Sequence, residues 1–159
     1  MSAPPPRALG IDFGERRIGV AATDALGIAA HPVEAIEART RDAAADRVAE
    51  IARERAAEVL VFGLPVHMDG RAHEAAVAVR AFARRCAART GLPVEYVDER
   101  LTTVEADRLL GAAGGGGRRR GAKGRVDMAA AAVLLRDWLE LRTAGGPAAK
   151  KQGGGPDEG

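Results

Sequence analysis

The sequence is poor in aromatic residues and in cysteine. Only 3% of its 159 residues are aromatic while 47% are hydrophobic, so the core must be built mainly from Ala, Val, Leu and Ile. Cys86 is the only cysteine, which excludes an intramolecular disulfide and a cysteine-based zinc site. Because Cys86 follows Phe82 and Ala83 in a helical pattern, we interpret it as a small, partly buried residue and not as a nucleophile.

The chain also lacks a strong excess of charge and a long apolar run. Its net charge is +2, so contact with nucleic acid would have to come from local basic clusters. No apolar run approaches the roughly 20 residues of a membrane-spanning helix. Prolines occupy the start of the chain, where a secretory signal would need apolar residues. We therefore expect a soluble cytoplasmic protein without membrane contact.

The length fits one domain with a proper core. Residues 1–6 are rich in proline and are expected to form a flexible leader. Residues 7–142 carry the regular apolar patterns and are expected to form the domain. Residues 143–159 are rich in Gly, Pro, Ala and Lys, a composition that predicts a disordered tail.

Apolar patterns along the domain predict alternating types of element. Strands are expected at 7–13, 17–23, 30–36, 58–63 and 94–97, and helices at 42–55, 72–90, 103–111 and 126–142. The first three strands follow one another directly, which is typical of an antiparallel meander. The later strands alternate with helices, which is typical of parallel strands joined by crossovers. The sequence thus predicts an α/β fold with a mixed five-stranded sheet flanked by helices.

Two local features refine this prediction. Pro32 lacks a backbone donor, so the strand at 30–36 should lie at a sheet edge or contain a bulge. The segment 114–125 is rich in Gly and Arg and is expected to be a mobile loop.

Three acidic residues lie at breaks between the expected elements. Asp12 ends the first strand, Glu99 follows the last strand, and Asp127 opens the last helix. Because ligands of such sheets bind at the carboxyl ends of the strands, the three carboxylates could meet at one edge. Carboxylate oxygens bind hard divalent cations, and two such ions can drive phosphodiester cleavage. Plainer interpretations are a turn aspartate, a surface ion pair and an acid at a helix start.

Further candidates for substrate contact flank these acids. His67 and Asp69 lie on the connection that follows the strand at 58–63. The other candidates are basic, and they are Arg16, Arg100, Arg119, Lys123 and Arg125. Such side chains contact phosphates without reading base sequence. Alternatively, His67 is a surface histidine, Asp69 belongs to a turn and the basic residues lie on a solvated linker.

Several segments in this order resemble the YqgF (RuvX) family over about residues 7–142. They are Gly10-Ile11-Asp12-Phe13-Gly14, Arg17-Ile18-Gly19-Val20-Ala21, Val61-Phe62-Gly63-Leu64-Pro65, Met68-Asp69-Gly70, Val97-Asp98-Glu99-Arg100-Leu101-Thr102-Thr103-Val104-Glu105-Ala106 and Lys123-Gly124-Arg125-Val126-Asp127. The resemblance implies a ribonuclease H-like fold and a cytoplasmic nuclease of ribosome biogenesis that matures the 5′ end of pre-16S rRNA. By matching positions it implies that Asp12, Glu99 and Asp127 form the acidic site. His67 departs from the Asn that is frequent in the family.

The expected activity is therefore a metal-dependent endonuclease on structured RNA, which the ribosome could present. Asp12 would bridge two Mg²⁺ or Mn²⁺ ions about 4 Å apart, while Glu99 and Asp127 would each hold one ion. The alternative is a Holliday junction resolvase that cuts four-way DNA junctions. A resolvase needs two sites across a two-fold axis, and the sequence leaves monomer and homodimer open.

Two other classes of function remain as rivals. The pattern Gly10-x-Asp12-x-Gly14 also resembles the phosphate loop of actin-like kinases and chaperone ATPases, which enclose their nucleotide between two such domains. A non-catalytic RNA-binding module is the other rival. Three carboxylates argue against it, because they gain nothing from an anionic backbone unless a cation intervenes.

Overall fold

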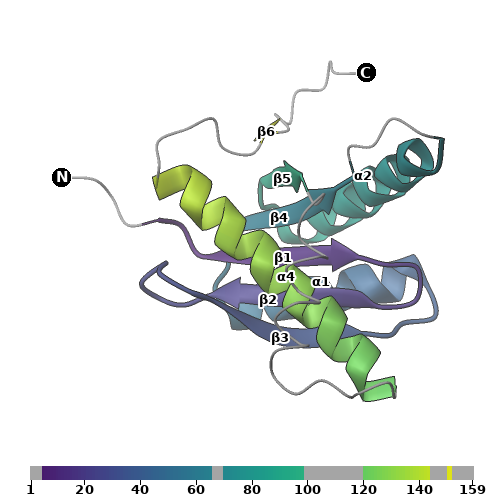
Figure 1. Ribbon diagram of the computed structural model, residues 1–159, viewed down its shortest axis with the longest axis horizontal. Coiled ribbons are helices and arrows are strands. Elements are labelled where there is room, and N and C mark those ends of the chain that lie inside the picture. The colour runs from purple at the N-terminus through teal and green to yellow at the C-terminus, as the bar shows by residue number, and fades with distance from the viewer. Residues whose placement is uncertain (1–4, 66–69, 99–119, 144–149, 152–159) are drawn as a thin grey trace.

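A mixed sheet forms the middle layer of the molecule, with helices on both faces (Figure 1). The computed structural model describes residues 5–65, 70–98, 120–143 and 150–151, and for 70–72, 120–127, 143 and 150–151 it describes the backbone alone. The elements are β1 (Ala8–Phe13), β2 (Ile18–Thr23), β3 (Ala30–Ile36), α1 (Arg41–Glu54), β4 (Val59–Leu64), α2 (Gly70–Thr90), β5 (Val94–Asp98), α4 (Arg120–Thr143) and β6 (Lys150–Lys151). The helix predicted at 103–111 lies outside the described residues.

The strands follow the order β3-β2-β1-β4-β5-β6. The β1–β2 and β2–β3 pairs are antiparallel, and the β1–β4 and β4–β5 pairs are parallel. The predicted meander and crossovers are therefore confirmed, and the predicted strand bounds are right to within one residue. Strand β3 lies at the sheet edge, and its register with β2 shifts between Val20 and Ala21, beside Pro32. Both consequences expected of Pro32 are thus present.

A sixth, very short strand extends the sheet beyond the five that were predicted. In β6, Lys150 and Lys151 pair antiparallel with Tyr96 and Glu95 of β5. These two residues lie in the segment for which disorder was predicted. Thr143 also belongs to that segment and is the last residue of α4 (Arg120–Thr143). Residues 144–149 and 152–159 lie outside the described residues, so their disorder stays a prediction, as does the division into leader, domain and tail.

Two apolar cores lie on opposite faces of the sheet. Side chains of a strand alternate between faces: Leu9 and Ile11 of β1 belong to the core under α1 and α2, whereas Ala8 belongs to the core under α4. Cys86 is fully buried in the first core, and burial raises the pKa of its thiol to about 12. This confirms its interpretation as an unreactive buried residue. Within the described residues, no helix has the length and apolar character needed to cross a membrane.

Helix α4 begins six residues earlier than predicted, at Arg120 and not at residue 126. The prediction of a mobile loop was therefore wrong for residues 120–125, and residues 114–119 lie outside the described part. Gly121 and Gly124 each disfavour a helix by about 1 kcal/mol relative to Ala. Because a propensity of this size yields to tertiary context, the two glycines did not mark the true start of the helix. Asp127 consequently lies inside α4, so its interpretation as an acid at the helix start is also wrong.

The C-terminal end of α1 contains a residue in an unfavourable backbone conformation. Ala56 has a φ of +53°, a left-handed conformation that costs an L-residue about 1–2 kcal/mol. Its N–H donates a hydrogen bond to the carbonyl oxygen of Arg53 at 3.2 Å. The N–H of Ala57 donates to the carbonyl oxygen of Ala52 at 2.9 Å. This pair of bonds is the Schellman motif, which favours glycine at the position of Ala56.

We therefore expect Ala56→Gly to stabilise the protein by about 0.5–1 kcal/mol, since relief of strain exceeds the entropic cost of glycine. Urea unfolding followed by circular dichroism would measure the change. The matched control is Ala57→Gly, at a half-buried neighbour outside the left-handed region, which should lower stability. A loss of stability in Ala56→Gly would contradict the prediction.

Candidate active site

Asp12 lies near the carboxyl end of β1, on the face of the sheet that α4 covers. Strand alternation puts it on the same face as Ala8 and Gly10, and Ala8 packs in the core under α4. Its side chain is half-buried. A carboxylate is therefore held at the end of a central strand, where it is still accessible to a ligand.

Glycines lie on both sides of Asp12 in the sheet. Asp12 pairs with Gly19 of β2. On the other side, Ile11 pairs with Phe62 of β4, so the next residue, Gly63, continues this register beside Asp12. Neither neighbour has a side chain, and glycine is the residue that allows a ligand to approach the backbone closely. The order of residues along the chain does not show this arrangement, which depends on the register between the strands.

The last side chains of β5 alternate between the two faces of the sheet. Val97 packs in the core under α4 and pairs with Gly63, whereas Tyr96 packs in the core under α1 and α2. Asp98 follows Val97 and therefore lies on the face opposite Asp12. Of the two adjacent acids at this strand end, Asp98 is thus excluded from the face of Asp12. Glu99 lies outside the described residues.

Helix α4 crosses directly over β1 at Gly10. A Cβ atom built on Gly10 would lie 2.5 Å from Leu135 Cγ and 3.1 Å from the carbonyl oxygen of Ala131, so only glycine allows this approach. Asp127 precedes Ala131 by one helical turn, just as Asp12 follows Gly10 by two strand residues. The close contact at Gly10 therefore fixes the height of α4 above the strand that carries Asp12.

We expect Gly10→Ala to lower the free energy of unfolding by about 1–3 kcal/mol, because α4 must move away from β1 to make room for a methyl group. Thermal unfolding would measure this loss. The matched control is Gly91→Ala at the end of α2, where a Cβ meets nothing within 4 Å but the φ of +72° is strained. Both variants should be destabilised, but only Gly10→Ala should reduce nuclease activity per folded molecule. Equal activity in the two would show that the height of α4 does not matter for the site.

Most of the other predicted site residues are not described in full. His67, Asp69, Glu99, Arg100 and Arg119 lie outside the described residues, and Lys123, Arg125 and Asp127 are described only as backbone positions of α4. Arg16 is exposed in the β1–β2 turn. Among the side chains that are described, no group of three His, Cys, Asp or Glu is placed to hold a metal ion. The proposed metal site thus depends on side chains beyond Asp12.

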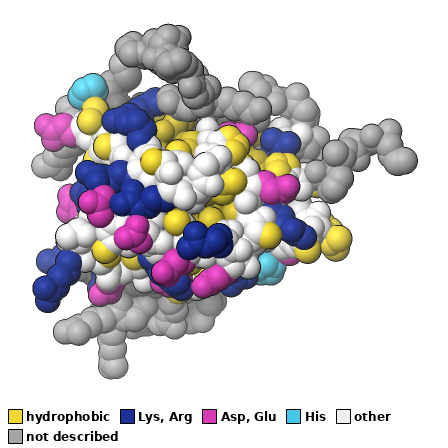
Figure 2. All heavy atoms as spheres, turned by 180° about the vertical axis from the view of Figure 1, so that it is seen from behind, with side chains coloured by type: hydrophobic (Ala, Val, Ile, Leu, Met, Phe, Trp, Pro, Cys, Tyr) yellow, Lys and Arg dark blue, Asp and Glu magenta, His cyan; other side chains and the backbone are white. Residues whose placement is uncertain are grey.

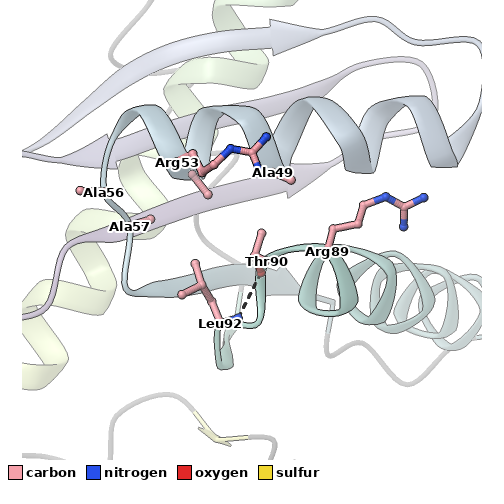
Figure 3. A pocket seen from close by; sticks show the side chains of 8 residues that line it. Ala49, Arg53, Ala56, Ala57, Arg89, Thr90 and Leu92 are labelled. Carbon is pink, nitrogen blue, oxygen red and sulfur yellow. Dashed lines mark hydrogen bonds between the residues drawn. The ribbon is translucent and has the colours of Figure 1, made fainter.

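A separate hollow of about 380 Å³ lies between the C-terminal ends of α1 and α2 (Figure 3). Its lining is mostly alanine and leucine, with Arg53 and Arg89 at its rim. It adjoins Leu92, shortly before β5 begins, and so lies at the opposite end of the parallel strands from Asp12. The hollow therefore does not contribute to the candidate active site.

Comparison with known proteins identifies relatives of nearly the whole chain. The sequence model of the RuvX family, described as Holliday junction resolvase, matches residues 6–141. A protein of a Picosynechococcus strain, named "Putative pre-16S rRNA nuclease", is 45% identical over 138 residues, which cover 87% of this chain and 94% of the relative. A protein of the same name from an Anaeromyxobacter strain is 44% identical over 138 residues, which cover 87% of this chain and 99% of the relative.

A solved structure supports the fold. RuvC of Thermus thermophilus in complex with a Holliday junction substrate superposes with a TM-score of 0.60, and the match covers 93% of this chain and all of that one at 16% sequence identity. This likeness confirms the predicted ribonuclease H-like fold. At so low an identity it carries no residue assignments.

Proposed function

Because the chain belongs to the RuvX family, a family of nucleases, we propose that it is a divalent-metal-dependent endonuclease that processes the 5′ end of pre-16S rRNA in ribosome biogenesis. The observation that carries this proposal is the position of Asp12, a half-buried carboxylate at a central strand end, flanked on both neighbouring strands by glycine. Such a position suits the binding of a divalent cation. The named relatives supply the substrate.

Asp12, Glu99 and Asp127 would hold the metal. Oxygen donors of this kind fit Mg²⁺ or Mn²⁺, and the glycines beside Asp12 place no side chain next to it. Two bound ions would activate the attacking water and stabilise charge on the leaving oxygen. The alternation of β5 favours Glu99 over Asp98 as its partner acid, and the helical turn before Ala131 favours Asp127. Asp12 is held near the end of the central strand β1.

The basic residues of the site would hold the phosphate backbone in register with the metal. Arg16, Arg100, Arg119, Lys123 and Arg125 are the proposed phosphate contacts, and His67 and Asp69 would face the substrate from the connection between β4 and α2. Positively charged side chains at these places position RNA without reading its sequence. The protein would encounter precursor rRNA in the cytoplasm, where the assembling ribosome could present it. Either a monomer or a homodimer could act on it there.

The test is a cleavage assay on two labelled substrates, a pre-16S rRNA fragment that includes the 5′ precursor segment and a four-way DNA junction. Each is incubated with purified protein and Mg²⁺, Mn²⁺ or EDTA. We expect metal-dependent cutting of the RNA and none of the junction. Cutting of the RNA that persists in EDTA would contradict the metal assignment.

One observation favours a second candidate function. The family that matches residues 6–141 is described as Holliday junction resolvase. Exclusive cutting of the four-way junction, together with a dimer in sedimentation analysis, would establish that function instead. Two cuts at symmetric positions would be expected from two sites related by a two-fold axis.

A further inference from the structure

Three exposed arginines lie at the end of the sheet where Asp12 is located. They are Arg16 in the β1–β2 turn, and Arg39 and Arg41 where β3 leads into α1. Strand pairing brings the two segments to the same end, because Phe13 of β1 pairs with Ile18 of β2, and Ile18 pairs with Ile36 of β3. Arg16, Arg39 and Arg41 therefore lie along one edge of the molecule next to the candidate active site, and this edge is called the rim.

The acidic residues nearest to this rim are largely neutralised by other partners. Glu37 forms an ion pair with Arg17 at 2.7 Å, and Asp42 pairs with Arg85 and Arg89 of α2. Within the described part of the chain, no ion pair involves the three exposed arginines. Glu15 is the remaining acid in the β1–β2 turn. The rim therefore keeps an excess of positive charge.

Arg41 is held in a defined orientation at this rim. Its guanidinium carbon lies 4.6 Å from the centre of the Phe13 ring, and Phe13 directly follows Asp12. A guanidinium stacked on a ring keeps its in-plane N–H groups available for phosphate oxygens. Stacking also lowers the entropy that the side chain would lose on binding. Arg41 is therefore prepared to bind an anion close to the strand end that carries Asp12.

Figure 2 shows the face that α1 and α2 cover, seen from behind. Lys and Arg side chains are more frequent on the left of that view, which corresponds to the right of Figure 1, the side toward which β1 runs. Acidic side chains are interspersed among them, in agreement with the ion pairs between α1 and α2. Basic side chains on this face are thus more frequent toward the end of the sheet that carries Asp12, although many of them are paired with acids.

We propose that the nucleic acid bound at Asp12 continues past the β1–β2 turn onto the β3–α1 connection, where Arg39 and Arg41 contact its phosphate backbone. This inference rests on the proposed function and extends it, because it places part of the substrate on the face opposite α4. It implies a substrate that wraps around the end of the sheet. Structured RNA with a bend or a single-stranded flank fits this requirement.

The experiment measures binding and cleavage separately. A fluorescently labelled pre-16S rRNA fragment is titrated with protein in Ca²⁺ at several salt concentrations, and fluorescence anisotropy gives the dissociation constant. The double variant Arg39→Gln/Arg41→Gln should bind about tenfold more weakly, with a salt dependence smaller by the equivalent of two phosphate contacts. The variant Arg39→Lys/Arg41→Lys should restore the salt dependence but only part of the affinity, because it keeps the charge and loses the in-plane N–H groups of the guanidinium stacked on Phe13.

The matched control is Arg53→Gln/Arg55→Gln, which removes the same charge at the other end of α1. It should bind RNA nearly as the wild type does. Equal weakening of RNA binding in the two Gln double variants would mean a general charge effect and would overturn the inference. Unchanged binding in Arg39→Gln/Arg41→Gln, with a wild type that cuts RNA, would also overturn it. A wild type that neither binds nor cuts RNA would overturn the proposed function as well. Thermal unfolding of each variant shows that the fold is retained.

Discussion

Asp12→Asn is expected to abolish cleavage while the protein stays folded. The amide has the size of the carboxylate but no negative charge, so it binds divalent cations poorly. Loss of metal-assisted catalysis removes several kcal/mol of transition-state stabilisation, which corresponds to a fall in rate of about 10³-fold or more. Because Asn has the size of Asp and the paired neighbours are glycines, we expect the half-buried position to accept the amide.

Asp98→Asn is the matched control for this prediction. Asp98 also ends a parallel strand of the same sheet, but it lies on the opposite face and is exposed. Its substitution should leave the cleavage rate within about a factor of two to three, a change of about 0.6 kcal/mol or less. Wild-type cleavage by folded Asp12→Asn would remove Asp12 from the site.

A second measurement on Asp12→Asn does not depend on activity. A ligand that binds only the native state raises its stability, by about 2.7 kcal/mol at a concentration of 100 times its dissociation constant. Mn²⁺ should therefore raise the melting temperature of the wild type and of Asp98→Asn, and raise that of Asp12→Asn much less. An equal rise in all three proteins would show that the ion binds elsewhere.

The sequence predicted the elements well where the signal was local. Short apolar runs marked β1, β2 and β4, since such a pattern depends only on neighbours in the chain. Local reasoning failed at the start of α4, where Gly121 and Gly124 indicated a loop. Helix α4 packs over strands β1 to β5. This packing is a long-range effect that the helix propensities of single residues do not describe.

The candidate site shows the same division. Asp12 could be identified from the glycines around it in the chain. That Gly19 and Gly63 flank it in space depends on the register between strands, and a slip of one residue would turn every side chain to the other face. The arginines at residues 39 and 41 carried no motif at all, and only the pairing of β3 with β2 brings them to the end of the sheet where Asp12 lies.

Trp138→Ala is expected to be among the most destabilising substitutions, at about 3–5 kcal/mol. Trp138 is fully buried in the core between α4 and the sheet. Its Nε1–H donates a hydrogen bond of 2.8 Å to Oε1 of Glu95, the buried charged residue of β5, which is 5% exposed. Removal of the indole leaves both a cavity and a buried carboxyl group without this donor. Urea unfolding would measure the loss.

Two milder variants separate the cavity from the hydrogen bond. Trp138→Phe keeps most of the ring but removes the donor, and should cost about 1.5–3 kcal/mol if the bond to the Glu95 side chain dominates. Glu95→Gln keeps an acceptor oxygen. It removes the buried negative charge, so loss of the Trp138 donor should cost less in its presence than in the wild type. The double variant should therefore be less unstable than the sum of the single ones. Strict additivity would show that the charge of Glu95 adds nothing to this hydrogen bond.

The same variants connect α4 to catalysis. Trp138 and Asp127 are three helical turns apart, at positions 127, 131, 134 and 138 of one helix face, so the indole anchors to β5 the helix that carries the proposed ligand. At temperatures where Trp138→Phe remains folded, we expect its cleavage rate to fall and its apparent affinity for Mn²⁺ to weaken. The control Gly91→Ala is destabilised at the end of the sheet opposite Asp12. It should keep both the cleavage rate and the affinity for Mn²⁺. If Trp138→Phe retains wild-type metal affinity, then the packing at Gly10 alone holds α4 over Asp12.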